Sequence, residues 1–398
     1  MAVHQLSVIC YYIAMHYFDW TATSPMGQKA LEVYSDIATR YIGNPSSTHP
    51  LGVRAKERLE AERGSIAAML GTKAEYIYFT SGGTEADSII LSSLLNSPSP
   101  GEIITTGIEH AAILEWKKTL ENHGWKFTSL RCPGGYLDPD TLEEALNEKV
   151  RMVAVMKVNN VTGTILDTNR IVKAVRSYEK RTGRKIHIHC DAVQALGKIS
   201  FYPEAEDLDS AAFSAHKFCG PRGVGILYNR NKAIASLSRA GGQEKGLRGG
   251  TENLAGICAT GAQLQQTLQN LKENHSEVLA KRDKIQDTVI ASGYSPISPS
   301  NTSGEIFTPY ILNICVKPIP SEVFLRVMAD KGFCLSSGSA CSSNSRGKAE
   351  SVLAAMNIPS TDRMSSIRIS LSPLNSDEEV DMLCNALEEA SKEFGIRK

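Results

Sequence analysis

The sequence predicts an α/β fold with a large domain, built on a mostly parallel sheet flanked by helices, and a smaller α/β domain after it. Between about residues 50 and 230, segments with helical periodicity alternate with short apolar segments that are typical of buried strands. This alternation indicates parallel strands joined by crossover helices. Because such sheets bind ligands at the carboxyl ends of their strands, the residues after each strand are the first candidates for a site.

The elements of the large domain follow one another in a regular order. We expect helix 51–70, strand 76–79, helix 83–95, strand 102–106, helix 111–122, strand 125–130, helix 139–148, strand 151–158, helix 168–181, strand 185–190 and strand 224–228. Gly71 is a suitable C-cap for the first helix, because glycine readily adopts the left-handed conformation. Pro139 stands in the first turn of its helix, where proline is well tolerated.

The second part of the chain predicts the smaller domain. A long polar helix at about 264–290, rich in Gln, Lys and Glu, is expected to act as the connector. Strand 309–316, helix 321–331, strand 366–371 and helix 377–394 follow it. We therefore expect a large domain at 29–265 and a small domain made of 15–28 and 266–398.

The N-terminal residues 1–14 precede the first recognisable motif, which runs from Tyr17 to Pro25. The apolar stretch 6–18 is too short to span a bilayer and has no lysine or arginine before it. We interpret residues 1–14 as a non-native or disordered extension, with Met15 as the biological start.

The composition excludes several classes of partner. Lysine plus arginine and aspartate plus glutamate both number 43, so the formal net charge is zero. No basic stripe indicates a nucleic acid or a membrane surface as partner. The nine cysteines are widely spaced and none forms a C-x-x-C pair, so no metal site is expected and a cytoplasmic location is favoured.

Lys217 is the most informative residue of the large domain. It follows the segment Ser214-Ala-His216 and precedes a Gly/Pro-rich turn and the apolar strand 224–228. An ammonium group held beside a packed core is costly unless it is paired or neutralised. A lysine that forms a Schiff base with an aldehyde cofactor requires this arrangement. The alternative is an exposed lysine at the start of a loop.

The segment Phe79-Thr-Ser-Gly-Gly-Thr-Glu-Ala86 runs from a predicted strand into a predicted helix. Gly82 and Gly83 allow backbone N–H groups to converge, and the helix N-terminus adds partial positive charge. Thr84 adds a hydroxyl group. The segment predicts a cradle for an anion, and the alternative is an ordinary turn with a threonine cap.

Asp191 comes directly after the predicted strand 185–190. A carboxylate there can pair with the ring nitrogen of a pyridine cofactor and keep it protonated. Gln194, three residues later, can reach a ring hydroxyl. The alternative role for Asp191 is to cap the next helix, and one residue can do both.

His110 and Asn160 also follow predicted strands. His110 comes after strand 102–106 and can stack on a planar ring and move protons near pH 7. Asn160 closes strand 151–158 and can donate a hydrogen bond to a cofactor or a substrate. The alternative for His110 is a histidine that is hydrogen-bonded within a loop.

Cys341 and Arg368 are candidates in the smaller domain. Cys341 lies in the Ser/Gly-rich segment 336–346, which predicts an exposed thiol of the reactive kind. Arg368 lies on the predicted strand 366–371 and has the geometry to bind a carboxylate with two hydrogen bonds. The alternative is an edge-strand arginine that faces water.

Together these segments resemble the cysteine desulfurases, which are pyridoxal-phosphate enzymes of the class V aminotransferase group. The resemblance extends from about residue 17 to residue 372 and implies the aminotransferase-like PLP fold type I. The matching segments are Asn44–His49, Phe79–Asp87, Glu109–His110, Asp191–Gln194, Ser214–Lys217, Gly246–Asn253 and Ser336–Cys341. The last segment distinguishes desulfurases from relatives that only transaminate or decarboxylate.

The resemblance implies pyridoxal 5'-phosphate as the cofactor, bound as a Schiff base to Lys217. Asp191 would hold the ring nitrogen, Gln194 the ring oxygen, and His110 would stack over the ring and act in catalysis. Further cofactor contacts are implied for Gly83, Thr84, Asn160, Ser214, His216 and Thr251. Thr251 would reach the phosphate of the neighbouring subunit, so the resemblance also implies a homodimer with shared active sites.

On the substrate side, Asn160 and Arg368 would hold the carboxylate of L-cysteine and Cys341 would attack its sulfur. The products implied are L-alanine and a persulfide on Cys341, for transfer to a protein acceptor in iron–sulfur cluster or thio-cofactor assembly. Two alternatives stay open: a selenocysteine lyase or cysteine sulfinate desulfinase, and a non-catalytic sulfur-transfer scaffold. The sequence departs from the family at Val161, where an acid is usual, and at Gly249, where serine is common.

Overall fold

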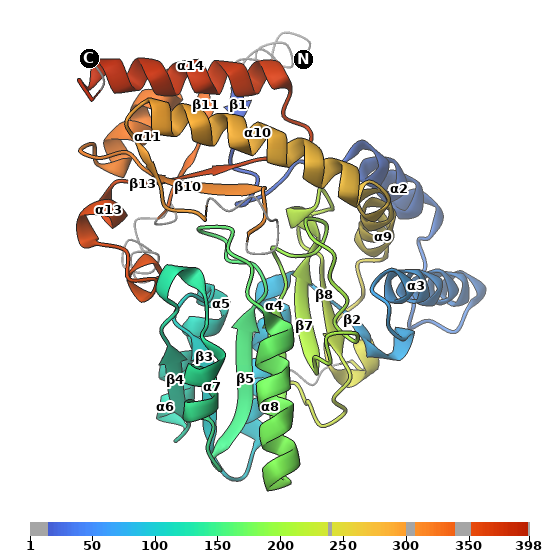
Figure 1. Cartoon of the computed structure of the whole chain (residues 1–398). Helices are drawn as coiled ribbons and strands as arrows, with labels where there is room; N and C mark the ends of the chain where they lie inside the picture. The colour runs from blue at the N-terminus through green and yellow to red at the C-terminus, as the bar shows by residue number, and fades with distance from the viewer. Residues whose placement is uncertain (1–14, 238–240, 300–306, 339–351, 397–398) are drawn as a thin grey trace.

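A seven-stranded sheet forms the centre of the larger part of the molecule (Figure 1). The computed structural model describes residues 15–237, 241–299, 307–338 and 352–396. The strand order is β2 (Ile77–Thr80), β8 (Gly225–Asn229), β7 (Ser210–Ser214), β6 (His187–Asp191), β5 (Val150–Met156), β3 (Glu102–Thr106) and β4 (Lys126–Leu130). The strands from β7 to β4 are mutually parallel, and β8 runs antiparallel to both of its neighbours. The predicted mostly parallel sheet is confirmed.

Helices cover both faces of this sheet. They are α2 (Gln28–Arg40), α3 (Pro50–Met69), α4 (Gly83–Ser93), α5 (Ala111–Leu114), α6 (Trp116–Asn122), α7 (Pro139–Ala145), α8 (Thr168–Thr182) and α9 (Leu254–Gln269). In β5, Val153 and Val155 belong to the hydrophobic cluster shared with α8, whereas Met152 and Ala154 belong to the cluster shared with α4. This alternation follows from the two-residue period of a strand, and it buries β5 on both faces.

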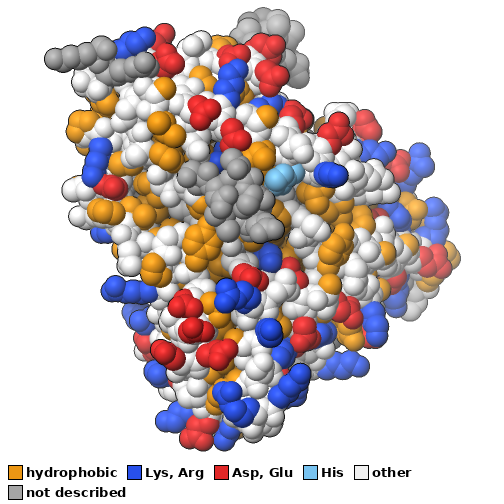
Figure 2. All heavy atoms as spheres, viewed as in Figure 1, with side chains coloured by type: hydrophobic (Ala, Val, Ile, Leu, Met, Phe, Trp, Pro, Cys, Tyr) orange, Lys and Arg blue, Asp and Glu red, His pale blue; other side chains and the backbone are white. Residues whose placement is uncertain are grey.

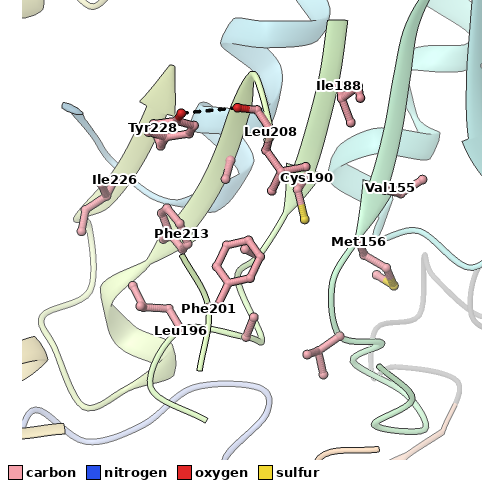
Figure 3. Packing of buried hydrophobic residues seen from close by; sticks show 14 of the residues in the cluster. Val155, Met156, Ile188, Cys190, Leu196, Phe201, Leu208, Phe213, Ile226 and Tyr228 are labelled. Carbon is pink, nitrogen blue, oxygen red and sulfur yellow. Dashed lines mark hydrogen bonds between the residues drawn. The ribbon is translucent and has the colours of Figure 1, made fainter. Parts of the chain in front are cut away.

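The cluster on the α8 face contains large aromatic side chains (Figure 3). The rings of Phe201 and Phe213 meet edge to face with their centroids 6.0 Å apart. The Tyr228 hydroxyl, although buried, donates to the carbonyl oxygen of Leu208 at 3.3 Å. These contacts support β7 and β8, the two strands that flank the segment carrying Lys217.

The smaller unit contains an antiparallel sheet of four strands in the order β12 (Ser336–Ser337), β13 (Ser366–Ser370), β10 (Ile311–Cys315) and β9 (Ser295–Pro296). Its helices include α10 (Leu271–Ala291), α11 (Ser321–Asp330), α13 (Ser360–Met364) and α14 (Asp377–Glu393). Figure 1 shows α10 and α14 side by side over this sheet, where they pack against each other. The short β1 (His16–Tyr17) pairs in parallel with β11 (Phe333–Cys334), so the N-terminal end of the described chain joins the smaller unit.

Two segments that were predicted as single helices are each divided between two helices, so these two predictions are wrong. The expected helix 264–290 is instead two helices, α9 and α10, which adjoin at Asn270. Much of α9 is buried and packs on α2, whereas α10 packs on α14, so the two helices belong to different layers. The expected helix 111–122 is likewise divided at Glu115 into α5 and α6.

Several elements were not expected from the sequence, among them β7, α2, α13 and the short strands β1, β9, β11 and β12. Strand β7 has the short sequence Ser-Ala-Ala-Phe-Ser, in which small residues give little strand signal. Helix α2 precedes the part of the chain in which helices and strands alternate. The remaining expected elements are present, with boundaries shifted by one to a few residues.

The core of the smaller unit combines Phe18 with residues from 278 to 390. Residues Val352, Leu353 and Met356 pack instead on the core of the large sheet, although they lie in the range predicted for the small domain. The boundaries proposed for the two domains stay predictions, and the proposed extension 1–14 lies outside the described residues.

The described helices include none that combines the length and the hydropathy needed to cross a membrane. On the face shown in Figure 2, acidic and basic side chains lie interspersed. This mixed surface matches the equal numbers of acidic and basic residues in the sequence.

Candidate active site

A cavity of about 480 Å³ lies where the carboxyl ends of the parallel strands meet β13 and the segment 19–22. Because β2, β3, β5, β6 and β7 end at the same edge of the sheet, residues far apart in sequence converge there. Most of the predicted site residues line this cavity: Gly83, Thr84, His110, Asn160, Asp191, Gln194, Ser214, His216, Lys217 and Arg368. Thr251 lies elsewhere, and Cys341 lies outside the described residues.

Lys217 projects into the cavity from a short 3₁₀ turn that follows β7. Its Nζ donates hydrogen bonds to the carbonyl oxygens of Thr21 at 2.7 Å and Ala22 at 2.8 Å. Burial and the nearby Arg368 guanidinium lower the pKa of Lys217 to about 8, against the opposing effect of Asp191. The alternative of a freely exposed surface lysine is therefore wrong, and a neutral nucleophilic amine is accessible near neutral pH.

Asp191 is the last residue of β6 and is buried. Its Oδ1 accepts a hydrogen bond from the Val193 N–H at 3.0 Å, so it shapes the following turn while its carboxyl group lines the cavity. Burial raises the pKa of Asp191, and the nearby His110 and Lys217 oppose this change. A buried carboxyl group in this position gains stability from a cationic N–H partner such as a protonated pyridine nitrogen.

The anion cradle is formed at the start of α4. A Cβ added at Gly82 would meet only the Ser214 Oγ, at 3.8 Å, so the space in front of this residue is open. A Cβ at Gly83 would come within 2.4 Å of Val193 Cγ2, so glycine is required for close packing on the Asp191 turn. The hydroxyl-bearing residues Thr84 and Ser214 line the same space, which suits the oxygens of a phosphate group.

Two histidines line the cavity in neutral form. The His110 Nδ1 accepts the Ala112 N–H at 3.1 Å as the N-cap of α5, so its Nε2 carries the ring proton. Loss of solvent around the ring lowers the pKa of His110. Burial and the charge of Lys217 lower the pKa of His216 to about 4, and its Nδ1 lies 3.0 Å from Thr23 Oγ1.

Arg368 enters the cavity from β13, which lies between β10 and β12. It is therefore a central-strand residue and is 5% exposed, so the alternative of an edge arginine facing water is wrong. One guanidinium nitrogen donates to the carbonyl oxygen of Asn160 at 3.0 Å and the other to Asp19 Oδ1 at 2.9 Å. Its buried Nε has no partner among the described residues, which leaves a donor for a ligand carboxylate.

Asn160 differs from its prediction in one respect. Strand β5 ends at Met156, so Asn160 lies in the loop beyond the strand and does not close it. It still borders the cavity, because the buried side chain of Asn159 holds this loop through hydrogen bonds to Ile108 O and the Val161 N–H.

The departure at Val161 does not change the cavity wall. Val161 is buried in the core, outside the residues that line the cavity. Thr251 is exposed, and its Oγ1 lies 3.5 Å from Asn44 Nδ2. Within its own subunit Thr251 is separate from the cavity residues.

Several cavity residues were missed in the sequence: Asp19, Thr21, Ala22, Asp87 and Ser336. Thr21 and Ala22 act through backbone carbonyl groups, which carry no sequence signal. Asp87 could have been found, because it is an acid on the apolar side of the predicted helix 83–95. It is buried, and its Oδ1 lies 3.0 Å from His189 Nε2.

Known proteins resemble this chain over nearly its whole length. The class V aminotransferase family matches residues 16–383. A NifS/IcsS protein homolog of Lactobacillus delbrueckii subsp. bulgaricus is 38% identical over 96% of this chain and 98% of its own length. A cysteine desulfurase of Trichormus azollae is 35% identical over 94% of this chain and 92% of its own. The solved structure of a NifS-like protein has a TM-score of 0.88 and 32% identity, and covers 95% of this chain and 99% of that one.

The cavity fits the cofactor of this family, which is pyridoxal phosphate. Lys217 supplies the amine for the aldehyde group, buried Asp191 the partner for the ring nitrogen, and the open space before Gly82 the room for the phosphate. The family match spans nearly the whole described chain, and the relatives match it over nearly their full length. The chain therefore belongs to the class V aminotransferase family of pyridoxal-phosphate proteins.

Proposed function

We propose that the protein is a cysteine desulfurase that converts L-cysteine to L-alanine and keeps the sulfur as a persulfide on Cys341. The observation that carries this proposal is that Lys217 of the large sheet and Arg368 of the small sheet face one cavity. An amine for the cofactor and a clamp for an amino-acid carboxylate thus lie together. The relatives named as cysteine desulfurases supply the substrate and the reaction.

Pyridoxal phosphate supplies an electron sink that stabilises negative charge at the α-carbon of the bound amino acid. Arg368 binds the substrate carboxylate, and Asn160 lies beside it at the same end of the cavity. Asp191, as the carboxylate, would keep a proton on the ring nitrogen. Gln194 would offer an N–H to the ring oxygen, and His110, which lines the same cavity, would stack on the ring.

Lys217 moves the proton at the α-carbon. A pKa of about 8 gives Lys217 an appreciable neutral fraction at pH 7.5, so it can remove this proton and return it. The carbonyl groups of Thr21 and Ala22 hold its Nζ at one end of the cavity. Both the proton removal and the capture of the cofactor use the same nitrogen.

Cys341 takes the sulfur atom from the substrate. The Cys341 thiolate attacks the sulfur of the bound cysteine, the S–S bond forms and the Cβ–S bond of the substrate breaks. The electron pair of the broken bond stays on the substrate Cβ, which takes up a proton and leaves as alanine. The enzyme retains Cys341 with one added sulfur atom, which a protein acceptor removes.

A homodimer is part of the proposal. Thr251 is exposed and lies in the segment Gly246–Asn253 that resembles the family, yet it is separate from the cavity of its own chain. We propose that Thr251 completes the phosphate site of the neighbouring subunit. Mixing Lys217→Ala and Thr251→Ala proteins should restore activity, because a mixed dimer has one undamaged site.

The acceptor class and the location are further parts of the proposal. We propose that the acceptor is a protein that passes the sulfur to iron–sulfur cluster or thio-cofactor assembly, as the resemblance to the cysteine desulfurases implies. The scattered cysteines favour the cytoplasm, where thiols stay reduced. Fractionation of the native cells would test the location.

The decisive experiment measures alanine and sulfide released from L-cysteine by the purified yellow protein. The Cys341→Ser variant should keep the colour and release neither product, and Cys384→Ser, on α14 and away from the cavity, is the matched control with full release. Full activity of Cys341→Ser would remove the thiol from the mechanism. Rates on selenocysteine and cysteine sulfinate distinguish a lyase or desulfinase, in which Cys341 matters less.

A further inference from the structure

Lys198 is a buried lysine directly behind the cavity wall. It is 4% exposed and follows the left-handed turn at Gly197. Its Nζ donates to Gln194 Oε1 at 2.9 Å and to the backbone carbonyl oxygen of Lys217 at 3.2 Å. Among the described residues no carboxylate lies within ion-pair distance of this nitrogen. A buried lysine without a carboxylate partner is rare and expensive, which points to a specific use.

The first consequence of Lys198 is a fixed orientation for the amide of Gln194. An ammonium group only donates hydrogen bonds, so the amide oxygen must face Lys198 and the amide nitrogen must face away. On the side of the amide that faces away from Lys198, Gln194 Nε2 donates one N–H to the carbonyl oxygen of Thr21 at 3.1 Å. The second N–H of Gln194 is then available to the cavity that this side chain lines.

The second consequence is a link between Gln194 and the turn that carries Lys217, since the Lys198 nitrogen donates a hydrogen bond to both. The groups that face this nitrogen are the Gln194 amide, Lys217 and the Cys219 thiol. Burial and the charge of Lys217 lower the pKa of Lys198 to about 7, and Cys219 opposes this change. The role of Lys198 therefore rests on the two hydrogen bonds that it donates, which the amine makes in either protonation state.

We propose that Lys198 is a positioning residue for the cofactor, which orients the Gln194 amide toward the ring oxygen. A hydrogen bond from Gln194 favours an anionic ring oxygen. The inference rests on the proposed cofactor contact of Gln194. Lys198 would act on the cofactor only through the side chain of Gln194, which lies between them.

The test uses Lys198→Met, which removes the donor and keeps much of the side-chain volume. Lys232→Met is the matched control, because Lys232 is exposed and away from the cavity. Apo-protein of each variant is titrated with pyridoxal phosphate to obtain Kd. Loss of one charge-assisted hydrogen bond should raise Kd for Lys198→Met about tenfold, with no change for Lys232→Met.

The pH dependence of the cofactor absorbance provides a second readout, without substrate. Without Lys198 the Gln194 N–H is no longer held toward the ring oxygen, so the anionic ring oxygen is less stabilised and the midpoint of the spectral change should move to higher pH by about one unit. A purely structural role of Lys198 would lower stability and leave this midpoint in place. An unchanged Kd and midpoint in folded Lys198→Met would overturn the proposal.

Two further variants test the same role of Lys198 if Lys198→Met does not fold. Lys198→Gln can still donate a hydrogen bond to Gln194, so it should preserve Kd within about threefold and keep the midpoint near the wild-type value. In a Gln194→Leu background, adding the Lys198 change should have little further effect on Kd, because the two residues act as one unit. Additive effects on Kd would contradict the proposed role through Gln194. A wild-type protein that does not bind pyridoxal phosphate would contradict the proposed function itself.

Discussion

The side chain of Val193 occupies the space in which a Cβ at Gly83 would have to lie, with Val193 Cγ2 only 2.4 Å from that position. The start of α4 therefore rests directly on the turn that follows Asp191. The phosphate cradle and the acid for the ring nitrogen are held in contact by this packing. A residue larger than glycine at position 83 would separate them.

We predict that Gly83→Ala lowers both stability and cofactor affinity, because the added methyl group must displace Val193 or the helix terminus. Overpacking of this kind costs about 1–3 kcal/mol. Gly82→Ala is the matched variant, since its Cβ has room and the backbone at Gly82 is extended, with φ 165°. It should keep the melting temperature and weaken pyridoxal phosphate binding, because the methyl group enters the phosphate space. Equal melting temperatures for both variants would contradict this packing argument.

Arg368→Met should raise KM for L-cysteine at least about tenfold and leave the cofactor absorbance in place. The reason is that the guanidinium supplies the charge-assisted hydrogen bonds to the substrate carboxylate. Arg368→Lys should recover only part of the loss, because lysine keeps the charge without the two-point geometry. Arg326→Met, at an exposed position of α11, is the control. A normal KM for Arg368→Met would place the carboxylate elsewhere.

The rate at which apo-protein captures pyridoxal phosphate should rise with pH through a midpoint near 8. Only the neutral amine of Lys217 attacks the aldehyde, and burial together with Arg368 lowers its pKa to about 8. Stopped-flow absorbance across about pH 6 to pH 10 measures this profile. A midpoint near 10.5, the ordinary lysine value, would show that Lys217 is not desolvated. Lys217→Ala should show no Schiff-base band at any pH.

Glu109→Gln should stabilise the protein at pH 8 and have little effect at pH 4. Burial raises the pKa of Glu109 from 4.5 to about 8, so the folded state keeps a proton that the unfolded state loses above pH 4.5. The stability present below pH 4.5 is therefore lost as the pH rises toward 8. Glutamine keeps the acceptor for the Met156 N–H at 2.9 Å and carries no such proton.

The measurement compares melting temperatures of wild type and Glu109→Gln between pH 4.5 and pH 8.5. The difference should grow across this window by several degrees, on the order of 5 kcal/mol in stability, and then level off. Glu57→Gln, at an exposed position of α3, should show no such trend. A difference that stays constant with pH would mean that Glu109 is ionised in the folded protein.

The sequence was sufficient to predict six of the seven strands of the large sheet and the site residues that follow several of them. Lys217, Asp191 and Thr84 could be found because strand-then-turn patterns are local, and parallel strands end at one edge. Strand β7 could not be found, because four of its five residues are small and depend on pairing with β6 and β8 for their conformation. The junction at Asn270 between α9 and α10 was missed for a similar reason, since the two helices differ only in the layers against which they pack.

The residues that hold the site in place were harder to predict from the sequence than the residues proposed to act on the cofactor and the substrate. Thr21 holds both Lys217 and Gln194 through one backbone carbonyl, and any residue type provides that oxygen. Lys198 follows an ordinary turn and has no pattern that distinguishes it from a surface lysine. Such residues become visible only when tertiary structure brings them together, because their roles depend on distance and burial.

The N-terminal segment 16–24 has a consequence for where the functional protein can begin. Part of this segment, β1, pairs with β11, and the carbonyl oxygen of Phe18 accepts a hydrogen bond from the Ser370 N–H. At its other end, the Ser24 N–H donates to the carbonyl oxygen of His216. The segment therefore joins the small sheet to the turn that carries Lys217. Translation from Met15 would preserve all of these bonds. Translation from Met26 would yield a chain that still contains Lys217, Asp191, Arg368 and Cys341, yet has lost the carbonyl groups that hold the lysine. Such a chain would contain every catalytic residue. It would still be inactive, because the late start removes the segment that holds Lys217.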